Sequence, residues 1–108
     1  MLKRAEDRVL NEIIDRIVLI TNPDKIILFG SRAKGTANKN SDYDVLILKK
    51  YARKKSLRQK LYKIGLTKEA PVDILVNTPI AYEMLKQKLY YVYHDISKFG
   101  IVVYEKAS

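Results

Sequence analysis

Two aspartates set two residues apart offer the clearest chemistry in this sequence. Asp42 and Asp44 stand at the start of an apolar run that extends to Leu48. Side chains alternate faces along a strand, so both carboxylates point the same way if this run is extended. Such carboxylates repel each other and are best tolerated around a divalent cation, and oxygen ligands favour Mg²⁺ or Mn²⁺. A lone Asp-x-Asp is nevertheless common where a turn meets a strand, so its surroundings decide its meaning.

A glycine and a serine lie shortly before these aspartates. Gly30 and Ser31 directly follow another apolar run, Ile26 to Phe29. Glycine permits a tight turn, and a turn from a strand into a helix presents backbone N–H groups and a hydroxyl, which suit a phosphate. Together with the two aspartates, this turn predicts a site for a metal-bound triphosphate.

Asp73 is the third candidate for the same site. It stands at the start of the apolar run that ends at Val76, where an unpaired ionised carboxylate would be costly and a bound metal would offset that cost. The alternative is that Asp73 lies at the exposed start of its strand, after Pro71. The sequence leaves both interpretations of Asp73 open.

The elements that must position these residues can be predicted from periodicity and turn residues. The first helix has apolar residues at spacings of three and four, and Asn22-Pro23 ends it. Thr78-Pro79 starts a later helix, with the threonine as N-cap. The predicted helices cover residues 2–20, 31–34, 49–63, 80–88 and 90–98, and the predicted strands cover 25–29, 42–48, 72–76 and 101–104.

A shared site constrains the topology of the sheet. Ser31 follows the end of the first strand whereas Asp42 opens the second, so these strands run antiparallel if they are neighbours. Asp73 opens the third strand, which then runs parallel to the second, and residues 49–71 can hold the crossover helix that a parallel pair needs. We therefore predict an α/β (α+β) fold in which helices flank a small mixed sheet.

Length and composition limit the number of domains, the kinds of metal site and the location of the protein. The 108 residues suit one domain, 1–108, and the absence of cysteine excludes thiolate metal sites and disulfides. No apolar run reaches the ~18 residues of a membrane span, and Met1 to Arg4 lead into charges, so we expect a cytoplasmic protein. The net charge of +9 favours acidic partners.

Other features allow more than one interpretation. Residues 49–63 are rich in lysine and arginine and contain no acidic residue, so this segment can bind RNA or an acidic partner, or it can form a solvated helix face. The tyrosines near residue 90 suit an interface or the core. His94, the only histidine, is expected at the surface.

The motif as a whole resembles a known family. The stretch from Phe29-Gly-Ser-Arg-Ala-Lys-Gly through Ser41-Asp-Tyr-Asp-Val-Leu-Ile is similar to the signature of the polymerase-β-like nucleotidyltransferase superfamily, and in particular to its minimal nucleotidyltransferases. The resemblance implies that Gly30 and Ser31 hold a nucleoside triphosphate and that Asp42, Asp44 and Asp73 bind two Mg²⁺ ions. It also implies that Asp73 accepts the proton of the acceptor, and that Arg32 and Lys34 lie near the phosphates, which is the least specific part of the match.

The resemblance extends to function and partners. Many minimal nucleotidyltransferases are antitoxins of small helical HEPN toxins, and some transfer AMP from ATP to a tyrosine of the toxin. This implies a protein adenylyltransferase with a HEPN-type partner, and a protein acceptor or a second subunit in a homo-oligomer would complete the cleft. Two alternatives stand beside it: a binding module that neutralises a partner by contact alone, and a nucleotidyltransferase that modifies a small molecule.

Overall fold

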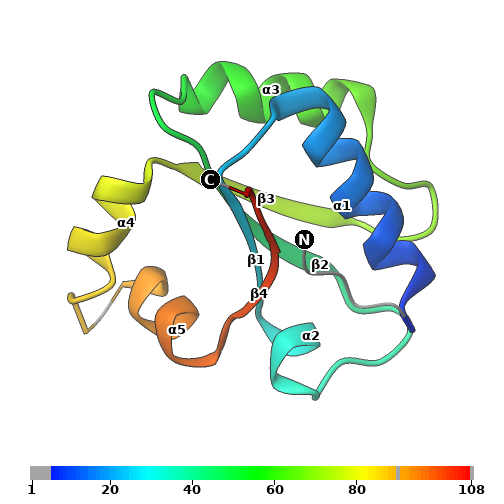
Figure 1. Ribbon diagram of the computed structural model, residues 1–108. Helices are drawn as coiled ribbons and strands as arrows, with labels where there is room; N and C mark the ends of the chain where they lie inside the picture. Colours follow the sequence, from blue (N-terminus) through cyan, green and yellow to red (C-terminus); the bar gives the residue numbers. More distant parts are fainter. Residues whose placement is uncertain (1–5, 90, 108) are drawn as a thin grey trace.

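The computed structural model describes residues 6–89 and 91–107. Leu2, Ala5 and Tyr90, which the sequence places in helices, lie outside these residues. The elements in chain order are α1 (Arg8–Thr21), β1 (Lys25–Phe29), α2 (Ser31–Lys34), β2 (Tyr43–Leu48), α3 (Lys54–Ile64), β3 (Val72–Asn77), α4 (Pro79–Leu85), α5 (Val92–Phe99) and β4 (Ile101–Glu105) (Figure 1).

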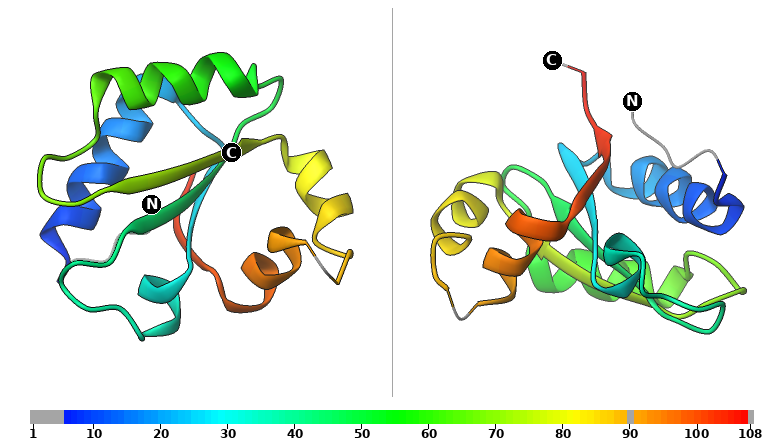
Figure 2. Two further views of the ribbon diagram at one scale, coloured as in Figure 1. Left: turned by 180° about the vertical axis from the view of Figure 1, so that it is seen from behind. Right: turned by 90° about the horizontal axis from the view of Figure 1, so that it is seen from below.

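The strands form one mixed sheet in the order β3-β2-β1-β4. Strand β1 pairs antiparallel with β2, and β2 pairs parallel with β3, as the shared-site argument predicts. Strand β4 adds antiparallel to the far side of β1, so β3 and β4 form the two edges. Helix α3 lies within the crossover between β2 and β3, alongside β3 (Figures 1 and 2).

Helices cover both faces of the sheet (Figure 2). On one face, Ile13 and Ile17 of α1 and Leu61 of α3 belong to the larger core cluster together with Val45 of β2. On the other face, Tyr82 of α4 and Ile96 of α5 form a smaller cluster with Ile27, Leu46 and Leu48. Odd-numbered residues of β2 therefore face α1 and α3, whereas even-numbered residues, including Asp44, face α4 and α5.

Helix α1 begins later than the apolar periodicity predicts. The carboxylate of Asp7 accepts a hydrogen bond from Leu10 N at 2.9 Å and serves as N-cap, so the first helical residue is Arg8. The predicted end is confirmed, because Asn22 adopts the left-handed conformation at φ 47° and precedes Pro23.

The predicted helical stripe of α3 is only partly confirmed. Leu61 is fully buried and Leu57 packs on the core, whereas Ile64 is 53% exposed at the end of the helix. Ile64 is the last residue of α3, directly before the C-cap Gly65.

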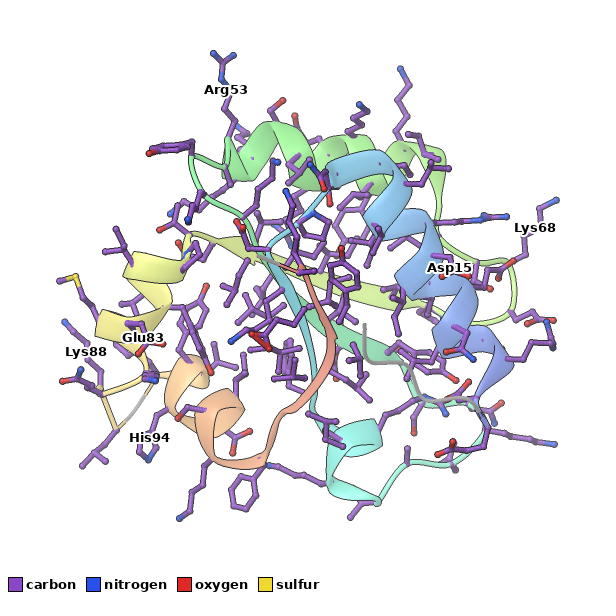
Figure 3. The ribbon with its side chains drawn as sticks, in the orientation of Figure 1. Asp15, Arg53, Lys68, Glu83, Lys88 and His94 are labelled. Atoms are coloured by element: carbon purple, nitrogen blue, oxygen red, sulfur yellow. The ribbon has the colours of Figure 1, made fainter. Side chains whose placement is uncertain are left out.

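The last two helices are separate and shorter than predicted. Helix α4 ends at Leu85 and α5 begins at Val92. His94 is half-buried between them, with its Nδ1 at 3.0 Å from Lys86 O, so it joins the two helices instead of lying free at the surface (Figure 3). Among the described residues, none of the helices has the length and apolar character that crossing a bilayer requires.

Candidate active site

Asp44 and Asp73 lie side by side at one end of the sheet. The parallel register pairs them directly across β2 and β3, and both face the α4 and α5 side. The pKa of Asp44 is raised to about 6, first because the carboxyl is partly buried, then because of the negative charges of Asp73 and Asp42 and a hydrogen bond with Asp73. The two carboxylates therefore form an acidic pair, but its members are Asp44 and Asp73 and not the Asp42 and Asp44 that the sequence places on one face.

Gly30 lies directly against the acidic pair. Phe29 is the register partner of Asp44, so the next residue, Gly30, turns the chain beside that carboxylate. A Cβ atom at position 30 would overlap the Asp44 side chain, and Gly30 has φ 71°, a region that other residues rarely adopt. Glycine is required here both by conformation and by close approach.

Asp42 stands apart from this pair. It is exposed and precedes the first residue of β2, Tyr43, so the pleat of the strand does not fix its side chain. Across residues 6–89 and 91–107, no three histidine, cysteine, aspartate or glutamate side chains lie close enough to hold a metal ion. The structure thus brings together two of the three predicted aspartates, and Asp42 acts on Asp44 through its charge.

Ser31 is the first residue of the short helix α2, for which Gly30 is the N-cap. The N–H groups of Ala33 and Lys34 bond back to Gly30 O at 3.1 Å. The N–H groups of Ser31 and Arg32 precede them and, as in any first helical turn, point out of the end of the helix. The predicted turn is therefore present, with its N–H groups beside the acidic pair.

Arg32 has a structural position that the sequence did not indicate. Its guanidinium donates to Ser41 O at 2.8 and 3.2 Å, and it lies 3.9 Å from the centroid of the Tyr43 ring. Tyr43 is buried on the opposite face from Asp44 and donates its hydroxyl hydrogen to Asp7. Arg32 thereby holds the loop that leads into the two aspartates.

Lys34 lies between α2 and α5. Its Nζ is 3.2 Å from Asp95 Oδ1 and 5.0 Å from the centroid of the Phe99 ring. To reach a phosphate, as the sequence predicts, Lys34 would have to leave its ion pair with Asp95.

A hollow of about 290 Å³ opens beside the acidic pair. Apart from Asp44 and Asp73, it is lined mainly by apolar and aromatic side chains, with Arg58 as the cation: Phe29, Arg58, Tyr62, Ile74, Leu75 and Val92. The sequence did not single out Arg58 and Tyr62. Their i,i+4 spacing places them on one face of α3, which was the available signal.

The donor set of the pair fits a hard divalent cation. Magnesium in phosphoryl-transfer sites is held by one or two carboxylates together with substrate phosphates, not by a complete protein cage. Asp44 and Asp73 supply the two carboxylates, and a cation would offset the burial and the repulsion that raise the pKa of Asp44.

Comparison with known proteins identifies the family. Residues 8–92 match the model of the nucleotidyltransferase domain, and the chain belongs to this family. A protein of Methanocaldococcus jannaschii named "putative protein adenylyltransferase" is 43% identical over 60 residues. That match covers 56% of this chain and 60% of the relative, so it spans less than two thirds of the relative's length.

Two solved structures share the fold. One is a nucleotidyltransferase, described as putative, from Sulfolobus solfataricus, with a TM-score of 0.58 and 16% identity over 92% of this chain and 79% of that one. The other is a toxin-antitoxin crystallised with AMP-PNP, with a TM-score of 0.56 and 21% identity over 89% of this chain and 73% of that one. Sequence identity at this level establishes the similarity of the fold alone.

Proposed function

We propose that this protein is a nucleotidyltransferase that transfers AMP from ATP to a hydroxyl group of a protein. The observation that carries the proposal is the Asp44–Asp73 pair, which lies against the Gly30 turn at the mouth of a hollow. Membership of the nucleotidyltransferase family supports the reaction class. The name of the M. jannaschii relative supports adenylyl transfer to a protein.

In this proposal the Gly30-Ser31 turn binds the triphosphate. The N–H groups at the start of α2 and the Ser31 hydroxyl donate to phosphate oxygens, and glycine lets the phosphates approach the backbone closely. Arg32 holds the loop before Asp42, and Lys34 is proposed to release Asp95 and turn toward the phosphates.

The chemical step joins the acceptor oxygen to the α-phosphorus. Asp73 accepts the proton of the acceptor hydroxyl, the new O–P bond forms, and the bond from the α-phosphorus to the bridging oxygen breaks to release pyrophosphate. Asp42, Asp44 and Asp73 would hold two Mg²⁺ ions, or Mn²⁺, which when bound neutralise the phosphates and the developing charge. The side chains of this chain align donor and acceptor, and alignment accounts for much of the rate.

The proposed acceptor is a tyrosine of a HEPN-type toxin, so the protein would act as an antitoxin. The structural similarity to a toxin-antitoxin crystallised with AMP-PNP supports an adenine nucleotide and a toxin as the partner. The apolar lining beside the carboxylates, which includes Phe29 and Leu75, also suits a phenolic ring.

The test is transfer of label from [α-³²P]ATP in the presence of Mg²⁺. The protein is incubated with a candidate HEPN-type protein from the same organism, and label on a tyrosine of that protein is expected. Asp73→Asn should lower the rate at least about a thousandfold, since the proton acceptor and a ligand are lost together. Asp15→Asn, the same change on α1 (Figure 3), is the matched control and should retain activity.

Two outcomes would overturn this proposal. If wild type neither binds ATP nor labels any protein, the protein is not an adenylyltransferase. If Asp42→Asn/Asp44→Asn protects cells from the toxin as well as wild type does, contact alone neutralises the partner.

A further inference from the structure

A second, larger hollow continues from the hollow at the acidic pair. It measures about 490 Å³ and is lined by Lys54, Lys55, Arg58, Gln59, Tyr62, Leu75 and Val76. Arg58, Tyr62 and Leu75 line both hollows, so the two adjoin. We call them together the edge groove, because they follow β3, an edge strand of the sheet, where α3 lies alongside it (Figure 1).

Hydrogen bonds fix the wall of the edge groove in place. Arg58 Nε donates to Ile74 O at 2.8 Å, and Ile74 N donates to the Tyr62 hydroxyl at 2.9 Å. Ile74 belongs to the edge strand, so α3 is attached to β3 through backbone groups that face away from β2. The groove is therefore preformed, which lowers the entropic cost of binding.

The two ends of the groove differ in chemistry. At the acidic end, Phe29, Leu75 and Val92 surround the carboxylates with apolar surface, which suits an aromatic ring. At the other end, the charged side chains are Lys54, Lys55 and Arg58, and no acidic residue of the described chain lines the larger hollow. Lys54 Nζ also lies 3.5 Å from Asn77 Oδ1, which places it at the far end of β3 from Asp73.

The difference between the apolar, acidic end and the basic end of the groove favours a peptide over a nucleic acid. A single-stranded nucleic acid carries phosphates along its whole length, whereas Lys54 and Lys55 line only the larger hollow. A peptide with one aromatic side chain at the apolar end and carboxylates further along matches both halves.

We propose that the edge groove binds the acceptor, a tyrosine within an acidic segment of the partner protein. The ring occupies the apolar end, and neighbouring carboxylates pair with Lys54 and Lys55. The phenolic oxygen bonds to the α-phosphorus of ATP, its proton passes to Asp73, and pyrophosphate leaves. This inference rests on the proposed function and adds to it the sequence context of the acceptor and the residues that select it.

The test uses two synthetic peptides and two charge-reversal variants of the full chain. In one peptide a tyrosine is flanked by glutamates, and in the other by glutamines. Lys54→Glu/Lys55→Glu reverses the groove charges, whereas Lys60→Glu/Lys63→Glu makes the same charge change elsewhere on α3 and is the matched control. Incorporation of AMP from [α-³²P]ATP is measured as a function of peptide concentration.

We expect wild type to prefer the glutamate peptide by at least about tenfold in kcat/KM. Lys54→Glu/Lys55→Glu should raise KM for this peptide about tenfold with KM for ATP unchanged, and the control should stay within about twofold of wild type. Equal use of both peptides, or equal effects of the two variants, would refute the inference. Labelling of a single-stranded RNA in place of either peptide would assign the groove to a nucleic acid and would also refute it.

Binding separates this inference from the proposed function. Fluorescence anisotropy of the labelled glutamate peptide, without ATP, needs no catalysis. Weaker binding by Lys54→Glu/Lys55→Glu but not by the control would support the groove even if no AMP were transferred. Absence of binding, or equal binding by all three proteins, would overturn the groove whether or not the enzyme is active.

Discussion

Asp44 and Asp73 occupy directly paired positions on the parallel strands β2 and β3, and the burial of Asp44 and the charge of Asp73 raise the pKa of Asp44. Neighbouring strands lie about 4.8 Å apart, so the fold forces two acidic side chains together on one face. The backbone of Gly30 lies directly against the Asp44 side chain. The folded protein therefore carries an unfavourable interaction at Asp44 that a bound cation would offset.

The acidic pair should make stability depend on pH. The pKa of Asp44 is raised from 3.8 to about 6 in the fold, so the folded protein binds a proton more tightly than the unfolded chain does. The contribution of this group to stability is thus full below pH 3.8 and is lost as the pH rises through 6. Asp44→Asn removes the charge and should raise the free energy of unfolding at pH 7 by on the order of 1 kcal/mol, allowing for screening by solvent.

This gain is measured by urea unfolding in EDTA at pH 7 and at pH 4, where it should shrink. Asp42→Asn, on an exposed side chain, is the control and should change stability less. An Asp44→Asn protein that is less stable than wild type at pH 7 would show that the burial and repulsion of the Asp44 charge do not dominate its contribution to stability.

Gly30→Ala should be far more damaging than Gly35→Ala. Gly35 (φ 78°, ψ 16°) has the left-handed helical conformation, in which alanine costs about 1 kcal/mol, whereas Gly30 (φ 71°, ψ −154°) has a conformation that is nearly exclusive to glycine and costs alanine more. Only at position 30 would the new Cβ overlap a side chain, that of Asp44, whereas Gly35 faces open space. We expect Gly30→Ala to lose at least about 2 kcal/mol more in urea unfolding. It should also lose binding of Mg-ATP by calorimetry. Equal losses for the two variants would mean that the close approach to Asp44 is not needed.

Arg32→Lys should loosen the loop before Asp42 without unfolding the protein. Lysine keeps the charge but cannot donate two hydrogen bonds to Ser41 O while it stacks on Tyr43. The expected result is faster hydrogen exchange at residues 36–41 with little change in the strands. Lys34→Arg, on the same helix, is the control. Unchanged exchange in this loop would assign Arg32 to another role.

Tyr43→Phe should destabilise the protein by about 1–2 kcal/mol, because Asp7 loses a buried hydrogen-bond donor. Asp7 is also the N-cap of α1, so the change should be read out by thermal unfolding and by exchange in the first turn of that helix. Tyr51→Phe, at a side chain that is 95% exposed, should stay within about 0.5 kcal/mol of wild type.

The topology was predictable because it follows from where the functional residues stand on their strands. Ser31 comes after β1, whereas Asp42 comes just before β2 and Asp73 lies near the start of β3, so a common site permits only the observed directions. The boundary at Asp42 was less predictable, because a loop residue and the first strand residue share the same sequence signals. Because β2 begins at Tyr43, Asp42 is exposed in the loop, whereas Asp44 lies within the strand and is partly buried.

The remaining features depend on tertiary contacts that no local pattern encodes. Arg32 has the residue type of a phosphate ligand, yet its guanidinium donates a hydrogen bond to the carbonyl oxygen of Ser41, which lies in the loop before Asp42. Arg58 and Tyr62 stand in a basic segment that could equally have been a solvated helix face. Only the attachment of α3 to the edge at Ile74 decides which of its cations line the groove.

The strand order has a consequence for how such a protein could be altered. The turn after β1 and the helix beside β3 lie on different segments of the chain, and β2 alone separates the two strands. Changes in α3 can therefore reshape what approaches from the outside edge while the Gly30 turn keeps its geometry. If the edge groove binds the acceptor as proposed, substitutions on the outward face of α3 should change the target, while Leu57 and Leu61 keep the helix packed on the core and the Gly30 turn is unaffected.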